Sequence, residues 1–504
     1  MSMQIKGEEQ NYFRFDFLKK PAKWKDYGTI QEFLSDIRGY GSTPAVCFGT
    51  DLSVTYAELV SDICGMCGAF EKMGLPRSGN VGLCAENGYY FVVLSLALMA
   101  YGCCAVLIPP AFRGKIPEAL LQKYDLSLVF VDKEDVRGKE TVYAGDPFSY
   151  RGSASEEVLK SDICPEDPAC IFFTGGTTGQ SKGAVLSHRA LLRGTANWQY
   201  NMFSLDHEDS YLALPLTHVF GYVRNFLVGL MLGNTVHFCT GMRNYFKDMM
   251  RICPNETVMV PKMADFLLET IERNGPGVTG GKLTTVVAGA AHVPEYLIRK
   301  LDRYGIHVYP GYGMTETANL TSGNPIPLAK TGSVGPLYPY QEAVIRDGEL
   351  LLKGKNLFSG YYGDPELTRA SFDDGWFKTG DLAHFDADGF LYITGRVKSL
   401  LALPTGEKIS PDELEIRVCG IDAVRDALLY RKEQEGAAGR LCLEVTLRPE
   451  IAEQLRSDGK NAEKYVTERI RAEIDGMPEC FHSAEIVIRD RDFDGTPSMK
   501  IRRP

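Results

Sequence analysis

The order of hydrophobic and polar positions in the first part of the chain predicts short strands that alternate with helices. Residues 45–49 and 53–57 are two apolar runs separated by a turn at 49–51, a pattern typical of a β-hairpin. An amphipathic helical pattern covers 55–75, and a short apolar strand is expected at 81–85. This alternation favours an α/β fold class, with parallel or mixed sheets flanked by helices.

The uncharged residues 91–108 have about the length that spans a bilayer. Their pattern nevertheless predicts two shorter elements, a buried helix at 89–101 that stops at Gly102 and a strand at 103–108. Neither element is long enough to cross the hydrocarbon core of a membrane. We therefore expect no transmembrane segment.

Composition excludes some classes of protein. A chain of 504 residues exceeds one compact core, so two or more domains are expected. The net charge of −10 disfavours nucleic-acid binding, which needs a basic surface. Thirteen scattered cysteines and a polar N-terminus favour reduced thiols and a cytoplasmic location. Cys64 and Cys67 lie one helical turn apart with no second pair at metal spacing, so we expect them to be buried residues rather than zinc ligands.

Residues 172–183, with the sequence FFTGGTTGQSKG, combine four glycines, four hydroxyl side chains and a lysine directly after the apolar run 169–173. The apolar run predicts a short buried strand. The glycines let the backbone approach a ligand, while hydroxyls, backbone N–H groups and a lysine can bind phosphate oxygens. The spacing differs from the common G-x-x-x-x-G-K-[ST] nucleotide loop. The stretch predicts a polyphosphate site, with a plain surface turn as the alternative.

Residues 172–183 resemble the motif [ST]-[ST]-G-[ST]-T-G-x-P-K-G of the adenylate-forming (AMP-binding) superfamily, which includes acyl-CoA synthetases. They depart from it at Gly175, where a hydroxyl residue is usual, and at Ser181, where proline is usual. The resemblance implies that the loop holds the phosphates of ATP and that Thr177 also binds Mg²⁺. The phosphate-binding residues it implies are Thr174, Gly175, Gly176, Thr177, Thr178, Gly179 and Lys182.

Other motifs of this superfamily follow in the family's order over about residues 45–503. They imply a large N-terminal adenylation domain at 1–396 and a small, mobile C-terminal domain of α+β type at 397–504. The hinge would lie near Lys398. The segment 406–415 matches the family's G-x-x-I-x-P-x-E-[IL]-E, a loop that swings toward the active site for the thioester step.

A second strong motif lies at 308–317, with the sequence VYPGYGMTET. A carboxylate close to three phosphates would be repelled unless a cation such as Mg²⁺ bridged them. By resemblance, Tyr312 stacks on adenine beside Gly313, Thr315 contacts the α-phosphate, and Glu316 binds Mg²⁺. A buried glutamate that caps a helix is the alternative.

Two further stretches, at 283–291 and around His218, are candidates for contact with the acyl group or the adenine. A strand expected at 283–291 ends in small residues, against which a flat ring or a chain can lie. The resemblance places adenine and the acyl group near its end. The residues concerned are Gly289, Ala290 and Ala291. His292 stands where the family often has proline, and we assign it no role.

A histidine beside apolar residues is most often structural, but His218 matches the family's P-L-x-H-x-x-G element. The resemblance implies that it lines and gates the acyl pocket. Members that activate amino acids usually carry an aspartate just after this point, where this chain has Phe220, Gly221 and Tyr222. The difference predicts an uncharged, apolar acyl or aryl tail.

The C-terminal third supplies the remaining candidates. Asp381 ends the turn motif GWFKTGD and can accept both ribose hydroxyls, as acidic residues do at other nucleotide sites. Arg396 would reach the ribose or a phosphate. Lys500 matches the family's catalytic lysine of adenylation, although Met499 replaces the usual glycine. A lysine can stabilise the charge that builds as a carboxylate attacks the α-phosphorus. Residues 348–354 resemble a further family block, which residues 360–362 follow, and both stretches are expected to be structural.

The resemblance implies an ATP-dependent acid–thiol ligase with ATP, Mg²⁺ and coenzyme A as cofactor and co-substrates. It would activate a fatty or aryl acid as an acyl-adenylate, release pyrophosphate, and pass the acyl group to coenzyme A, as in fatty acid metabolism. One alternative is a loader of a phosphopantetheinyl carrier protein. Another is a catalytically inactive nucleotide-binding scaffold, against which the intact Lys182, Glu316, Asp381 and Lys500 argue.

Overall fold

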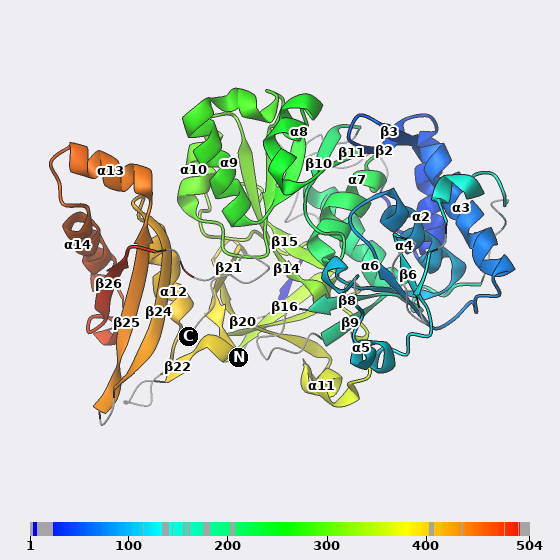
Figure 1. The fold of residues 1–504 in the computed structure, drawn as a ribbon. Coiled ribbons are helices and arrows are strands. Elements are labelled where there is room, and N and C mark those ends of the chain that lie inside the picture. The colour runs from blue at the N-terminus through cyan, green and yellow to red at the C-terminus, as the bar shows by residue number, and fades with distance from the viewer. Residues whose placement is uncertain are drawn as a thin grey trace.

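The computed structural model describes most of the chain. The described residues are 4–7, 24–113, 115–133, 141–143, 145–154, 157, 159, 162–174, 182–201, 207–402, 408–434, 437–477, 479–491 and 493. Figure 1 shows a large part formed by the N-terminal four fifths of the chain and a smaller part that carries β24, β25 and β26.

Two mixed sheets with largely parallel interiors form the large part. In the described residues the first has the order β18-β9-β8-β5-β4-β6-β7. Its strands are β4 (Asn80–Cys84), β5 (Cys104–Leu107), β6 (Val129–Val131), β7 (Thr141–Val142), β8 (Pro168–Thr174), β9 (Lys182–Ser187) and β18 (Gly360–Tyr361). The strands from β8 to β7 run parallel, and β9 and β18 add an antiparallel edge.

The second sheet has the order β15-β14-β13-β12-β10-β11-β2-β3 in the described residues. Its strands are β2 (Pro44–Phe48), β3 (Leu52–Thr55), β10 (Asp209–Leu212), β11 (Thr235–Phe238), β12 (Glu256–Met259), β13 (Thr285–Ala288), β14 (His307–Met314) and β15 (Asn319–Gly323). Only the strands at its two ends, β3 and β15, pair antiparallel. The predicted parallel or mixed sheets are confirmed.

A third, antiparallel sheet follows in sequence and connects the large part to the smaller one. Its order is β1-β16-β17-β20-β19, and β21 pairs with β20. The strands are β1 (Gln4–Lys6), β16 (Gln341–Arg346), β17 (Glu349–Gly354), β19 (Phe372–Asp373), β20 (Trp376–Phe385) and β21 (Leu391–Arg396). The hairpin between β20 and β21 turns at Asp388 and Gly389.

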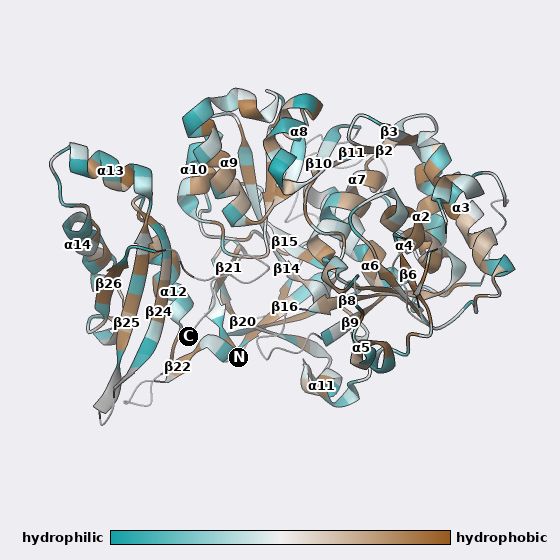
Figure 2. Cartoon of the chain, in the orientation of Figure 1, coloured by the Kyte–Doolittle hydropathy of each residue, from teal (hydrophilic) through white to brown (hydrophobic). Residues whose placement is uncertain are grey.

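In the described residues, helices cover the sheets of the large part and pack with them around a main hydrophobic core, with two smaller hydrophobic clusters beside it. They are α2 (Ile30–Ile37), α3 (Tyr56–Lys72), α4 (Tyr89–Tyr101), α5 (Glu118–Lys123), α6 (His188–Ala196), α7 (Val228–Met231), α8 (Tyr245–Ile252), α9 (Pro261–Asn274), α10 (Glu295–Asp302) and α11 (Pro365–Ala370). A π-helix, η6 (Phe220–Leu227), precedes α7. Figure 2 shows hydrophobic residues concentrated on the interior strands and helices, as this core requires.

The early sequence predictions are confirmed. β2 and β3 form the expected hairpin, and α3 begins after the N-cap Thr55 and carries Cys64 and Cys67 in the core. α4 ends before Gly102, whose φ of 105° is the left-handed conformation that favours glycine at a helix end. No helix in the part of the chain that the structure describes is long and apolar enough to cross a membrane.

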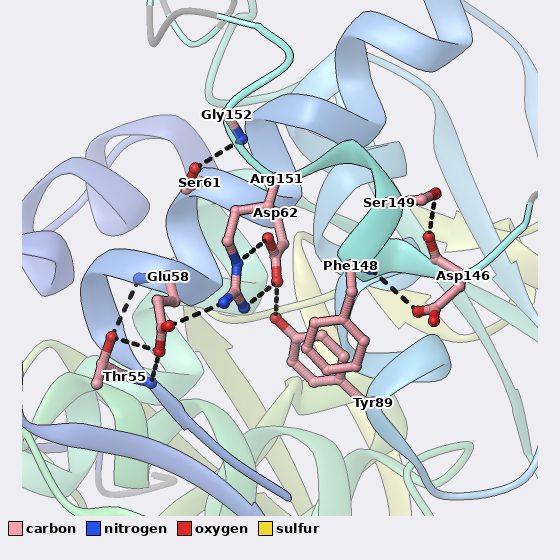
Figure 3. Close-up of polar contacts among 10 residues, drawn as sticks. All are labelled: Thr55, Glu58, Ser61, Asp62, Tyr89, Asp146, Phe148, Ser149, Arg151 and Gly152. Atoms are coloured by element: carbon pink, nitrogen blue, oxygen red, sulfur yellow. Dashed lines mark hydrogen bonds and ion pairs between the residues drawn. The ribbon is translucent and has the colours of Figure 1, made fainter.

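A polar cluster fastens the segment 145–152 to helix α3 (Figure 3). The Arg151 guanidinium donates from Nε and Nη2 to the two carboxylate oxygens of Asp62, at 2.7 Å each, and from Nη1 to Glu58 at 2.8 Å. The Tyr89 hydroxyl donates to the same Asp62. Helix α3 and the segment approach closely, since a Cβ on Gly65 would lie 2.0 Å from the carbonyl oxygen of Tyr150.

The smaller part has its own hydrophobic core, which in the described residues is built from a three-stranded sheet, three helices and the two-stranded sheet of β22 (Leu401–Ala402) and β23 (Lys408–Ile409). The remaining elements are α12 (Pro411–Cys419), β24 (Val424–Gln434), β25 (Ala437–Leu447), α13 (Pro449–Ser457), α14 (Ala462–Asp475) and β26 (Glu485–Arg489). Arg448, just before α13, reaches across to the large part. Its Nη1 donates to Asp265 of α9 at 2.8 Å, and its guanidinium lies 4.0 Å from the centre of the Tyr296 ring. The fold class predicted from the sequence, including the α+β C-terminal part, is confirmed.

Candidate active site

The candidate site is built on the end of strand β14. This strand runs into η9 (Thr315–Thr317), a single 3-10 turn. The close pairing of β14 with β15 requires glycine at Gly313, because a Cβ there would lie 1.9 Å from the carbonyl oxygen of Asn319. The Thr317 hydroxyl accepts from Met314 N at 3.0 Å and donates to Asn319 O at 2.7 Å, which fixes the turn. Thr315 and Glu316 are thereby held just past the strand end.

Tyr312 belongs to a first polar cluster beside this turn. Its hydroxyl donates to Asp381 Oδ2 at 2.6 Å, and Arg396 Nε lies 2.9 Å from Asp381 Oδ1. Asp381 and Arg396 are paired residues of β20 and β21, which explains why they meet. Burial, and then the carboxylate of Asp381, raise the pKa of the Tyr312 hydroxyl, so it stays a neutral donor. Three residues predicted to contact the nucleoside are therefore neighbours in space.

Glu316 belongs to a second polar cluster. The Tyr361 hydroxyl donates to Glu316 Oε1 at 2.7 Å, and the Lys182 ammonium lies 5.2 Å from the centre of the Tyr361 ring. The backbone N–H of Phe358 donates to the carbonyl oxygen of Glu316 at 2.8 Å. The sequence predicted Lys182 and Glu316 for this site but treated Tyr361 as structural.

The predicted phosphate loop joins β8 and β9. Thr174 and Lys182 are paired across these antiparallel strands, so the loop leaves and re-enters the sheet at adjacent positions. Five predicted loop residues and the lysine predicted to be catalytic lie outside the described residues. They are Gly175, Gly176, Thr177, Thr178, Gly179 and Lys500.

The two predicted acyl-site stretches come together at Gly289. A Cβ on this glycine would lie 3.0 Å from Cζ of Phe220, so the Phe220 ring lies against its backbone. Ala290 has a φ of 65°, a left-handed conformation that costs energy for a residue with a side chain. Ala291 and His292 follow it in the same exposed loop.

Both histidines of this region favour the neutral form. Nearby protein atoms lower the pKa of His292 and of His218, although both residues are exposed at the surface. A neutral imidazole can both donate and accept a hydrogen bond at pH 7.

The predicted hinge region follows β21. Lys398 lies in the 3-10 turn η10 (Val397–Ser399), directly after Arg396. The start of α12 docks on this segment, because Arg396 N donates to Asp412 Oδ2 at 3.1 Å and Ser410 Oγ donates to Thr394 O at 3.1 Å. Any rotation about Lys398 would break these two contacts, so they mark where the smaller part leaves the larger one.

Tyr361 is the site residue that the sequence analysis missed. No fixed spacing links it to Glu316, which lies 45 positions earlier. Only the pairing of β18 with β9 brings it to the phosphate loop. The available signal in the sequence was an aromatic hydroxyl after a glycine, shortly beyond the block at 348–354 that resembles the family.

The chain belongs to the AMP-binding enzyme family, whose model matches residues 33–362. A 2-succinylbenzoate–CoA ligase of Bacillus cereus (strain Q1) is 28% identical over 395 residues, which are 74% of this chain and 79% of that protein. The membership confirms the resemblance inferred from the motifs.

Solved structures share the whole architecture. The apo form of MatB from Rhodopseudomonas palustris has a TM-score of 0.76 at 23% identity, with 94% of this chain and 97% of that chain covered. An o-succinylbenzoate CoA synthetase from Bacillus subtilis, solved with its acyl-adenylate intermediate, has a TM-score of 0.73 at 22% identity, with 93% and 96% covered. These likenesses support the fold.

Family, relatives and fold together define the class of enzyme. It is an AMP-forming acid–thiol ligase, which activates a carboxylic acid with ATP and transfers the acyl group to coenzyme A. The function predicted from the sequence is confirmed at this level.

Proposed function

We propose that the protein converts an aryl acid into its coenzyme A thioester at the end of strand β14. The observation that carries the proposal is the short step from Tyr312 to Glu316. These five residues connect the cluster around Asp381 with the cluster around Tyr361. Groups suited to a nucleoside and groups suited to phosphates thus lie at two ends of one turn.

In the first half-reaction the substrate carboxylate attacks the α-phosphorus of ATP, and pyrophosphate leaves. Asp381 and Arg396 hold the ribose, and Tyr312 packs on adenine beside Gly289, Ala290 and Ala291. Thr315 hydrogen bonds to the α-phosphate. Residues 174–179 and Lys182 hold the β- and γ-phosphates, and Lys500 stabilises the charge that develops in the transition state.

Mg²⁺ suits the oxygen donors at this end of the strand. It usually binds one or two protein carboxylates together with phosphate oxygens and water. Among the described residues, no group of three or more His, Cys, Asp or Glu side chains is arranged to hold a metal alone. Glu316, with Thr177 from the loop, is the metal-binding group we propose. The bound ion would offset the negative charge of the phosphates.

In the second half-reaction the 397–504 domain rotates about Lys398. This rotation withdraws Lys500 and brings the 406–415 segment toward the acyl-adenylate. A thiol then attacks the acyl carbonyl, and AMP leaves. Coenzyme A is the acceptor, and a phosphopantetheinyl carrier protein is the alternative, because both present the same thiol arm.

An aryl acid is the substrate class we favour over a fatty acid. The relatives named above are a 2-succinylbenzoate–CoA ligase and an o-succinylbenzoate CoA synthetase, both of which act on an aryl acid. The Phe220 ring also lies against Gly289, and an aromatic ring at this position suits an aryl group. His218, with its lowered pKa, gates this pocket as a neutral group. A cytoplasmic location stays a prediction from cysteine usage.

The test is a screen for pyrophosphate release with aryl acids and with fatty acids of graded length. Each acid is assayed with coenzyme A, with a phosphopantetheinylated carrier protein, and with no thiol. We expect an aryl acid with coenzyme A to give the highest kcat/KM. Faster turnover with a fatty acid would overturn the substrate class, and faster turnover with the carrier protein would overturn the acceptor.

The role of Lys500 is tested by Lys500→Ala. Removal of a group that stabilises transition-state charge costs about 10²–10³-fold in rate, so adenylation should fall by that factor. Thioester formation from supplied acyl-adenylate should be largely kept. Arg503→Ala removes another cation from the same tail and serves as the control. Adenylation that survives in Lys500→Ala would contradict the assignment.

A further inference from the structure

We propose that Tyr361 is a positioning residue for the adenylation step, which orients Glu316 with its hydroxyl and Lys182 with its ring. The inference rests on the proposed roles of Glu316 at the metal and Lys182 at the phosphates. The new element is the Tyr361 side chain, which fixes the position of the Glu316 carboxylate relative to the Lys182 ammonium before ATP binds.

The backbone around Tyr361 is fixed to the strand that begins with Lys182. β18 pairs antiparallel with β9, with Tyr361 opposite Ala184. Ser359 N donates to Val185 O, and Tyr362 N donates to Gly183 O, both at 2.9 Å. Tyr361 therefore starts from a backbone that is registered against the end of the phosphate loop.

A glycine makes the close approach on the other side of Tyr361 possible. Gly360 has a φ of 144°, and a Cβ there would lie 2.7 Å from Cγ2 of Thr368. The Thr368 hydroxyl in turn accepts a hydrogen bond from Tyr361 N at 2.9 Å. Both the conformation and the space at this position favour glycine. The strand and the helix α11 thus hold the Tyr361 backbone from two sides.

The side chain is equally constrained. Phe358 packs edge-on against the Tyr361 ring, with centroids 4.9 Å apart and an interplanar angle of 70°. The same Phe358 holds the backbone carbonyl of Glu316 through its N–H. With the ring fixed, its hydroxyl can hold Glu316 Oε1 at 2.7 Å in one orientation. This hydrogen bond leaves Oε2 of the same carboxylate available to a cation.

Tyr361 is an uncharged residue that contacts two groups of opposite charge, the Glu316 carboxylate and the Lys182 ammonium. The Tyr361 hydroxyl is an uncharged donor that hydrogen bonds to the Glu316 carboxylate. The Lys182 ammonium lies 5.2 Å from the ring centre, within the range of a cation–π contact. The ring thereby keeps the lysine beside the loop, close to the carboxylate.

Tyr361→Phe removes the hydroxyl and keeps the ring. Hydrogen bonds to charged groups contribute about 1.5–3 kcal/mol, so we expect the dissociation constant of the divalent ion to rise about tenfold. The probe is Mn²⁺, whose binding is followed by electron paramagnetic resonance in the presence of a non-hydrolysable ATP analogue. Tyr361→Leu, which removes the ring as well, should in addition weaken binding of the analogue several-fold.

Tyr362→Phe is the matched control. Tyr362 is the next residue of the same segment, and its ring stacks on Tyr124, with centroids 5.6 Å apart, rather than on the Glu316 side. It should leave Mn²⁺ binding unchanged. A dissociation constant within twofold of wild type in Tyr361→Phe, or an equal rise in Tyr362→Phe, would overturn the proposal. Because the readout is ion binding, it is independent of whether any acid supports pyrophosphate release, which tests the proposed function.

Discussion

Asp62 and Asp381 are two buried carboxylates that bind the same kinds of partner, an arginine and a tyrosine hydroxyl. Asp62 binds Arg151 and Tyr89, and Asp381 binds Arg396 and Tyr312. Their side chains are 0% and 3% exposed. Chemistry and burial alone therefore do not separate a structural group from a group of the active site.

The surroundings of the two groups differ. Arg151 donates hydrogen bonds to Asp62 from two nitrogens and to Glu58 from a third, and its side chain is 33% exposed (Figure 3). Arg396 reaches Asp381 from the last residue of β21, next to the predicted hinge, and is 54% exposed. At Asp62 all the partners belong to the protein, and such a network stabilises the fold. At Asp381 the arginine partner is exposed, so a ligand can approach and donate its hydroxyls to the carboxylate.

The largest effect that would separate the two groups is a loss of stability in Asp62→Ala. Removing the carboxylate leaves the Tyr89 hydroxyl without its acceptor and leaves Arg151 with Glu58 alone, which costs about 3 kcal/mol. We expect the free energy of unfolding of the large part to fall by this amount, measured by urea unfolding with tryptophan fluorescence. The KM for ATP of the folded fraction should stay unchanged. A raised KM would mean that Asp62 also serves the nucleotide site.

Asp381→Asn should show the opposite behaviour. Two ribose hydroxyls would lose their charged acceptor, and each such hydrogen bond contributes about 1.5 kcal/mol, so kcat/KM for ATP should fall about 10²-fold. The asparagine keeps the volume and one acceptor for Tyr312, and the free energy of unfolding should change by less than about 1 kcal/mol. Steady-state kinetics and urea unfolding check the two halves. A stable variant with unchanged ATP kinetics would remove Asp381 from the ribose site.

His188 is a buried structural residue, and the effect expected from it on stability is the smallest of the three. Its buried Nδ1 accepts from Ile30 N at 3.3 Å, and burial lowers its pKa from 6.5 to about 4. The unfolded chain therefore binds a proton below pH 6.5 that the folded chain does not, so stability falls as the pH falls from 7 toward 4. The shift corresponds to about 2 kcal/mol between pH 7 and pH 5.

His188→Asn should remove that part of the pH dependence, because its amide keeps an acceptor without the proton. Urea unfolding at pH 7, 6 and 5 measures it. An equally steep loss of stability in the variant would assign the pH dependence to groups other than His188. The charge of Asp167 opposes the effect of burial, because it raises the pKa of His188.

Local sequence patterns predicted much of the fold and part of the candidate site. The periodicity at 89–101 predicted α4 and the apolar run at 169–173 predicted β8, because both depend on neighbours along the chain. The motif at 308–317 likewise located Tyr312 and Glu316. Contacts between distant residues were not predictable in this way.

Three features depend on packing between segments that the sequence does not connect. Arg151 meets Asp62 across 89 positions, and Arg448 meets Asp265 across 183. Tyr361 reaches Glu316 only because β18 adds to the edge of a sheet formed much earlier in the chain. Hydrophobic periodicity predicts elements, but it does not specify which strand edge a later segment joins.

The central claim is that a substrate carboxylate attacks the α-phosphorus of ATP. The most direct measurement uses an acid labelled with ¹⁸O in both carboxylate oxygens, with ATP, Mg²⁺ and coenzyme A, and mass spectrometry of the nucleotide and phosphate products. Attack at the α-phosphorus, followed by thiol attack on the acyl carbonyl, leaves one carboxylate oxygen in AMP. We predict AMP with one ¹⁸O atom and unlabelled pyrophosphate. Formation of ADP with the label in inorganic phosphate, or AMP without label, would contradict the account.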